Sequence, residues 1–113
     1  MIEGSQIDWG GHANDSDYII TEMLEFNRAI GAVLDFAASD GNTLVIVTAD
    51  HETGGYALQY GSKMGAVEGA FTSDYHTADL IPVFAYGPGA EAFSGIYENT
   101  AIFDKMKELL QFD

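Results

Sequence analysis

The sequence is poor in cysteine, proline and positive charge: its 113 residues include no cysteine, two prolines and four lysine or arginine residues. Because cysteine is absent, disulfides, thiolate metal sites and cysteine nucleophiles are excluded. Against those four cations stand 18 aspartate and glutamate residues, which leave a formal net charge of −14. Such an acidic chain repels nucleic acid and anionic membrane surfaces, so we expect neither as a partner.

Long hydrophobic runs are also lacking. No apolar stretch of the sequence approaches the roughly 20 residues of a membrane-spanning helix. The opening residues have neither a basic region nor an apolar region, so we expect no signal peptide there. The composition is nevertheless that of a globular protein, with 47% hydrophobic residues, and the length suits one domain. The excess acid then has two explanations: a solvated surface, or carboxylates gathered around cations.

Hydrophobic periodicity in the first half of the chain predicts a helix and a buried strand. Apolar residues spaced by alternating fours and threes predict a helix over residues 17–38, and the glycine-rich stretch before it, 4–17, is predicted to be a loop. The run at 43–48 is continuously apolar and β-branched, which is typical of a strand covered on both faces in a parallel sheet. A helix followed by such a strand indicates an α/β architecture.

The second half of the chain is predicted to alternate loops with shorter elements. We expect a long glycine-rich excursion with a short hairpin over 52–80, a second buried strand over 81–86 and a last helix over 100–111 that buries its apolar side chains. The chain opens on Met1-Ile2-Glu3, directly before the predicted loop. If a strand ends at Glu3, most of that strand lies outside the sequence, which favours a piece of a larger domain.

Three histidines stand near carboxylates at spacings that suit metal binding. Asp50 and His51 follow the predicted strand 43–48, and ligands of α/β proteins bind just beyond the carboxyl ends of strands. Asp8 precedes His12 by four residues, and His76 follows Asp74 by two. Mixed imidazole and carboxylate ligands suit Zn²⁺. The alternative interpretation, solvated loop histidines, stays open on spacing alone.

Three motifs, in order, resemble signatures of the alkaline phosphatase family. Residues 3–12, EGSQIDWGGH, resemble the family segment E-G-x-x-I-D-x-x-x-H, and residues 43–51, TLVIVTADH, resemble its T-L-V-I-V-T-A-D-H. His76-Thr77, followed by VFAYGP at 83–88, resembles the third signature. The resemblance implies that residues 1–113 form the C-terminal metal-binding part of an alkaline phosphatase domain. The implied fold is α/β, with part of a mostly parallel mixed sheet flanked by helices.

The resemblance also implies roles for individual residues in a site with two zinc ions and one magnesium ion. It assigns six metal ligands: Glu3 to magnesium, Asp8, His12 and His76 to a first zinc, and Asp50 and His51 to a second zinc. Trp9 stands at a variable position of the substrate pocket, and Gly11 stands where some members carry aspartate. Because His76 precedes its strand while the other ligands follow theirs, we expect strands 43–48 and 81–86 to be antiparallel.

The implied reaction is hydrolysis of phosphomonoesters by way of a phosphoserine. The nucleophilic serine of the family lies upstream in an Asp-Ser-Ala motif, and no serine here has that context. We therefore expect no catalytic nucleophile in this chain, an inactive isolated chain, and a missing N-terminal part of the enzyme as its partner. Arg28, the single arginine, lies on the polar face of the predicted helix and is not assigned to phosphate. Family members are commonly homodimers, and their export suggests a periplasmic or secreted protein.

Two other interpretations were weighed against this one. The chain could be an autonomous metal-binding module without catalytic activity, which the incomplete strand at Met1 disfavours. It could also be a related metal-dependent hydrolase, such as a phosphodiesterase or sulfatase relative, which the order of the three motifs disfavours.

Overall fold

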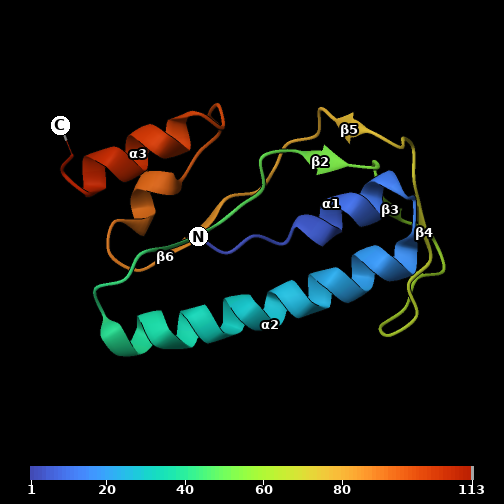
Figure 1. The fold of residues 1–113 in the computed structure, drawn as a ribbon, viewed down its shortest axis with the longest axis horizontal. Helices are drawn as coiled ribbons and strands as arrows, with labels where there is room; N and C mark the ends of the chain where they lie inside the picture. Colours follow the sequence, from blue (N-terminus) through green and yellow to red (C-terminus); the bar gives the residue numbers. More distant parts are fainter. Residues whose placement is uncertain (113) are drawn as a thin grey trace. The chain divides into compact units, whose positions relative to one another are not determined.

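The computed structural model describes residues 1–112. Its helices and strands follow one another in this order: α1 (Ser5–His12), α2 (Ser16–Asp40), β1 (Val45–Val47), β2 (Glu52–Thr53), β3 (Ala57–Leu58), β4 (Gly69–Ala70), β5 (His76–Thr77), β6 (Phe84–Tyr86), the 3-10 helix η1 (Ala90–Phe93) and α3 (Ala101–Leu109) (Figure 1). The chain divides into two compact units. Unit 1 combines residues 1–29 with 51–81, and unit 2 combines residues 30–50 with the chain from Pro82 onward.

Helix α1 replaces the loop that the sequence predicted over 4–17, so that prediction was wrong for residues 5–12. Glycine disfavours a helix by about 1 kcal/mol per residue, and α1 contains both Gly10 and Gly11. The two glycines are buried because neighbouring segments approach them closely. A Cβ on Gly10 would lie 2.9 Å from Ile19 Cγ1, and one on Gly11 would lie 2.7 Å from the carbonyl oxygen of Thr53. Close packing thus offsets the poor helix propensity.

Helix α2 confirms the predicted helix, with two extra residues at the C-terminal end and one at the start. Its first turn is capped by Asp15, whose Oδ1 accepts the backbone N–H of Tyr18 at 3.0 Å. At the other end Gly41 adopts φ 72° and donates its N–H to the carbonyl of Ala37 at 2.9 Å. None of the helices in the described part of the chain is long and apolar enough to cross a membrane.

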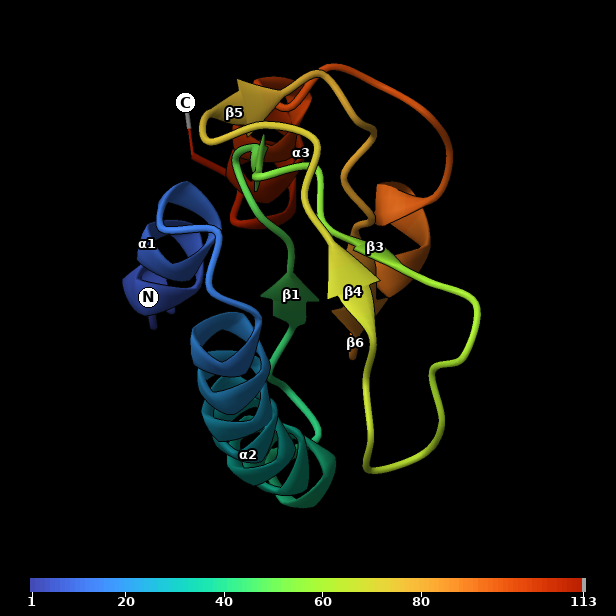
Figure 2. The same cartoon turned by 90° about the vertical axis from the view of Figure 1, so that its right-hand side faces the viewer.

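Unit 1 contains two small antiparallel strand pairs. Strand β2 pairs with β5, with Glu52 opposite Thr77 and Thr53 opposite His76, and β3 pairs with β4. Figure 2 shows β3 and β4 side by side, with the connecting loop extending beyond them. This is the short hairpin that the sequence predicted within 52–80. The Glu52 carboxylate closes the turn after β2 by accepting the backbone N–H groups of Gly55 and Tyr56 at 3.0 and 3.3 Å.

Unit 2 is built on the antiparallel pair of β1 and β6, in which Val45 lies opposite Tyr86 and Val47 opposite Phe84. The predicted antiparallel arrangement of the two segments is confirmed, with strands shorter than expected. The predicted burial of the strand over 81–86 was wrong, because Phe84 is 64% exposed and Tyr86 48% exposed. Lys105 joins α3 to η1 by donating to the carbonyl of Ala92 at 2.7 Å. Each strand pair among residues 1–112 is antiparallel, so the mostly parallel sheet stays a prediction.

Few apolar side chains are buried in the described part of the chain. The buried ones are Ala37, Val45 and Phe93, all in unit 2. The prediction that the last helix buries its apolar side chains was wrong, because Phe103 of α3 is 64% exposed and Leu110, the residue after α3, is 61% exposed. The physical reason is that unit 2 is too small to cover every face of its elements.

The packing around the glycines predicts that two glycine-to-alanine substitutions change the free energy of unfolding in opposite directions. We expect Gly11→Ala to lower the free energy of unfolding by about 1–3 kcal/mol, because its methyl group would overlap the backbone of Thr53. Gly31→Ala, in α2, is the matched control: no atom lies within 4 Å of its added methyl group, and we expect a gain of about 0.5–1 kcal/mol. Urea denaturation followed by circular dichroism measures both. Equal stability of the two variants would contradict the proposed close approach of α1 to β2.

Candidate metal centre

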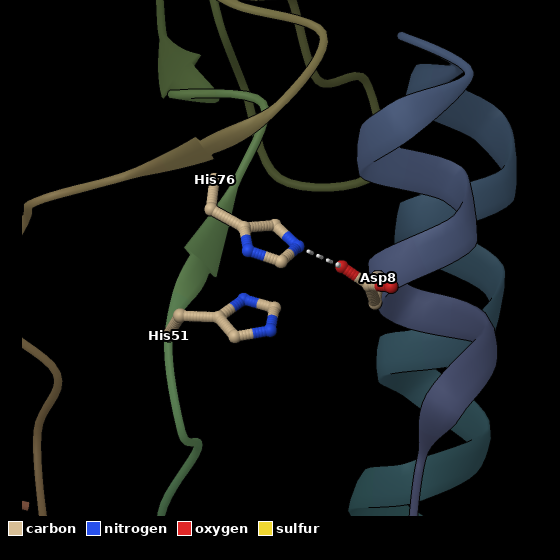
Figure 3. Close-up of side chains that lie close together, drawn as sticks. All are labelled: Asp8, His51 and His76. Carbon is tan, nitrogen blue, oxygen red and sulfur yellow. Dashed lines mark ion pairs between the residues drawn. The ribbon is translucent and has the colours of Figure 1, made fainter.

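Three side chains from separate segments of unit 1 meet in one cluster: Asp8 of α1, His51 just before β2, and His76 at the start of β5. Each offers one ligand atom, and these atoms all lie within 4.8 Å of one another. Figure 3 shows the Asp8 carboxylate directed from its helix toward the two imidazole rings. We call this set the metal cluster.

Local structure explains why these three side chains meet. Asp8 and Gly11 lie three residues apart, on the same face of α1, and Gly11 is the residue that packs against Thr53 of β2. The Asp8 carboxylate therefore faces β2. Thr53 pairs with His76 across the two-stranded sheet, and His51 precedes Thr53 by two residues. The helix–strand contact and the strand register together bring the carboxylate to both histidines.

Two imidazole nitrogens and one hydroxyl group lie close to the Asp8 carboxylate. Its Oδ1 lies 3.5 Å from Nε2 of His12, 3.8 Å from Nε2 of His76, and 2.5 Å from the hydroxyl oxygen of Thr53. The side chains of Asp8 and His12 are 35% and 33% exposed, so the site is open to solvent on one side. A carboxylate that two imidazole nitrogens face is suited to share a cation with them.

The imidazole rings are ordered by stacking as well as by hydrogen bonds. The rings of His51 and His76 stack with centroids 3.6 Å apart and an angle of 20° between their planes, and Tyr75 stacks on His76 at 4.8 Å. These ring contacts fix the orientation of the His76 imidazole between the rings of His51 and Tyr75.

His12 is oriented by a backbone acceptor. Its Nδ1 lies 2.8 Å from the carbonyl oxygen of Asp74, and a carbonyl only accepts. In neutral His12 the proton therefore belongs on Nδ1, which leaves the lone pair of Nε2 directed at Asp8. A bond from the second ring nitrogen to a carbonyl is the usual support of a metal-binding histidine. Asp74, an uncertain ligand by sequence, contributes its backbone oxygen here.

The remaining predicted site residues lie outside the metal cluster. Glu3 is exposed and precedes α1. Trp9 lies on α1 beside Asp8 in sequence and is 55% exposed. Asp50 belongs to unit 2 and is exposed. The assignments of Glu3, Trp9 and Asp50 stay predictions, as do the roles of the histidines as ligands.

Thr53 is a site residue that the sequence analysis missed. Its hydroxyl contacts both Asp8 and His51, at 2.5 and 3.2 Å. One signal was available, because residues two apart in a strand lie on the same face, and Thr53 follows His51 by two. The contact with Asp8 spans 45 positions of sequence, and no local pattern reveals it.

Comparison with known proteins places the chain in a family. The model of the alkaline phosphatase family matches residues 1–70 and 65–112. Alkaline phosphatase 3 of Bacillus subtilis is 29% identical in an alignment that covers all of this chain. The alkaline phosphatase of Escherichia coli is 33% identical in an alignment that covers 97% of this chain. The chain spans 40% of the length of the first relative and 27% of the second.

Solved structures give the same result. The alkaline phosphatase of the Antarctic bacterium TAB5 superposes with a TM-score of 0.91 at 54% identity, over 98% of this chain and 34% of that enzyme. A mutant of the TAB5 enzyme with Mg bound in its M3 site matches with a TM-score of 0.89 at 52% identity, over 98% of this chain and 35% of that one.

The helices, strands and donor set thus define an α/β protein with a candidate metal centre. The chain belongs to the alkaline phosphatase family, and its α/β fold is alkaline-phosphatase-like. The donor set is consistent with the metals of such a protein, since imidazole and carboxylate ligands suit Zn²⁺.

A conservative substitution tests the metal cluster. We expect Asp8→Asn to weaken Zn²⁺ binding by more than the ~10- to 100-fold typical of residues that only support ligands, because it removes the negative charge between the imidazoles. Asp79→Asn is the matched control, since Asp79 is exposed and lies outside the cluster. Isothermal titration calorimetry measures both affinities. Unchanged affinity in Asp8→Asn would remove Asp8 from the ligand set.

Proposed function

We propose that this chain is the metal-binding part of an alkaline phosphatase that hydrolyses phosphomonoesters. The observation that carries the proposal is the convergence of Asp8, His51 and His76 within 4.8 Å in a chain of this family. The three residues stand at positions where the sequence resembles metal-ligand motifs. Neither the family nor the cluster alone would suffice: the family supplies the reaction class, and the cluster supplies the chemistry that the reaction needs.

The proposed metal set is two zinc ions and one magnesium ion. We assign Asp8, His12 and His76 to a first zinc, Asp50 and His51 to a second zinc, and Glu3 to magnesium. The contacts of Asp8 Oδ1 with Nε2 of His12 and His76, at 3.5 and 3.8 Å, support the first assignment. When bound, such ions supply Lewis-acid chemistry, lowering the pKa of coordinated water toward about 7 and offsetting charge on phosphoryl oxygens.

The residues of this chain would hold and orient that machinery. His12 keeps its Nε2 directed at Asp8 because Nδ1 bonds to the carbonyl of Asp74. Tyr75 stacks on His76 and restricts the tilt of its ring. The assignment of Trp9 to the substrate pocket follows from the resemblance alone, and its side chain is 55% exposed.

The proposed enzyme needs a further part that carries the nucleophile. None of the serines in this chain has the Asp-Ser-Ala context of the family, and the chain spans 27–40% of the relatives named above. We therefore assign the serine and the remaining metal ligands to a preceding part of the enzyme. The exposed apolar side chains at the C-terminal end of the chain, Phe103 of α3 and Leu110 directly after it, support a role as packing surface for further elements, including a mostly parallel sheet. A homodimer and a periplasmic or secreted location follow from the resemblance alone.

A second candidate function is an autonomous metal-binding module without catalytic activity. The specific observation in its favour is that Asp8, His12, His51 and His76 all belong to unit 1. That unit carries its own strand pairs and its own contact between α1 and β2. Such a module would bind metal by itself and gain no activity from any partner.

An activity assay separates these two functions. We expect the 113-residue chain to give no turnover of p-nitrophenyl phosphate at alkaline pH with Zn²⁺ and Mg²⁺, because it lacks the serine. Addition of a family fragment that contains the Asp-Ser-Ala motif and the upstream ligands should restore hydrolysis. The same mixture with that serine changed to alanine is the control. Robust turnover by the chain alone would show that its nucleophile is not missing, and a mixture that stays inactive would favour the autonomous module.

A further inference from the structure

The hydroxyl of Thr53 lies between two residues of the metal cluster. Its oxygen is 2.5 Å from Oδ1 of Asp8 and 3.2 Å from Nδ1 of His51, and the contacts are half-buried. Thr53 itself belongs to β2, where its backbone pairs with His76. One non-ligand side chain thus touches two of the three clustered residues and shares a register position with the third.

The hydrogens of this contact can be assigned by counting donors and acceptors. An ionised carboxylate has no proton to give, so the hydroxyl of Thr53 donates its single proton to Asp8. The threonine oxygen then has only lone pairs left for His51. The contact with His51 is therefore a hydrogen bond only when Nδ1 carries the proton and donates it. In neutral His51 this places the lone pair on Nε2, so that Nε2 is the nitrogen that would coordinate a metal ion.

We infer that Thr53 is a positioning residue that sets the tautomer of His51 and the rotamer of Asp8 through one relay, from His51 Nδ1–H to the Thr53 hydroxyl to Asp8 Oδ1. The inference rests on the proposed metal site. It explains how two of the proposed ligands are held in the orientation and tautomer that metal binding requires. Partners behind metal ligands usually fix tautomer and ring orientation in this way. Here a single hydroxyl serves two ligands.

The packing of Thr53 keeps the relay in place. A Cβ on Gly11 would lie 2.7 Å from the carbonyl oxygen of Thr53 and 2.9 Å from its Cβ, so α1 and β2 touch at this residue. Threonine is stiff at χ1 because its Cβ is branched. With its backbone held by β5 and its side chain confined by α1, the hydroxyl has little freedom to turn away from Asp8 and His51.

The first test is the tautomer itself in the metal-free chain. Long-range ¹H–¹⁵N correlation spectra at about pH 9, where an unperturbed imidazole is neutral, distinguish a protonated from a bare ring nitrogen. We expect His51 to carry its proton on Nδ1 in the unmodified chain, and to shift toward a mixture of tautomers in Thr53→Val. A His51 protonated on Nε2 in the unmodified chain, or an unchanged spectrum in the valine variant, would overturn the inference.

The second test is zinc affinity, measured by competition with a chromogenic chelator. Valine keeps the branched shape of threonine and removes the hydroxyl, whereas serine keeps the hydroxyl and removes the methyl group. We expect Thr53→Val to bind Zn²⁺ about 10- to 100-fold more weakly, and Thr53→Ser to retain the affinity of the unmodified chain. Equal losses in both variants would point to packing and overturn the role of the hydroxyl.

Thr77→Val is the matched control. Thr77 lies in the partner strand β5, and its hydroxyl also donates to a carboxylate, that of Glu52, which is outside the metal cluster. We expect its zinc affinity to stay unchanged, and a loss as large as that of Thr53→Val would overturn the inference. Far-UV circular dichroism checks that each variant is folded. Absence of zinc binding by the unmodified chain would overturn the proposed metal site as well, whereas normal binding by Thr53→Val would overturn only the role of Thr53.

Discussion

The close approach of α1 to β2 is the contact on which the metal cluster depends. Gly11 has no side chain, and that absence lets the helix backbone reach Thr53, which a methyl group at this position would prevent. Asp8, on the same helix face, is thereby carried to His51 and His76, whose own positions follow from β2 and β5. Without this contact the cluster would lose the carboxylate of Asp8, the one acidic side chain among its three members.

The chain is rich in hydrophobic residues but buries few of them. The chain has 47% hydrophobic residues, but few of them are buried among residues 1–112, and Phe103 and Leu110 near its C-terminal end are exposed. Hydrophobic burial, the dominant favourable term of folding, is thus used sparingly here. Side-chain hydrogen bonds contribute as well: Glu52 bonds to the turn after β2, and Lys105 bonds to η1. The exposed apolar side chains support the proposal that this chain packs against further elements of a larger enzyme.

Sequence reasoning succeeded where structure is local and failed where it is not. The helix over 17–38 and the two strand segments at 43–48 and 81–86 were predictable, because hydrophobic periodicity and β-branched residues favour particular backbone conformations. The burial of the second strand was not, since Phe84 and Tyr86 are exposed. Helix α1 was missed, because two glycines oppose helix formation locally and only contacts with Ile19 and Thr53 compensate. The burial of α3 was overestimated, because the sequence shows that a helix has an apolar stripe but does not show whether another element covers that stripe.

The sequence by itself determined the family and the order of the candidate ligands along the chain, since these depend on motifs of contiguous residues. Tertiary structure alone decided that Asp8, His51 and His76 converge, that His12 turns its Nδ1 to Asp74, and that Thr53 stands between Asp8 and His51. The physical reason is the difference in sequence separation between the residues that interact. A ligand motif depends on neighbouring residues, whereas a ligand's orientation depends on contacts that here join residues 45 and 62 positions apart.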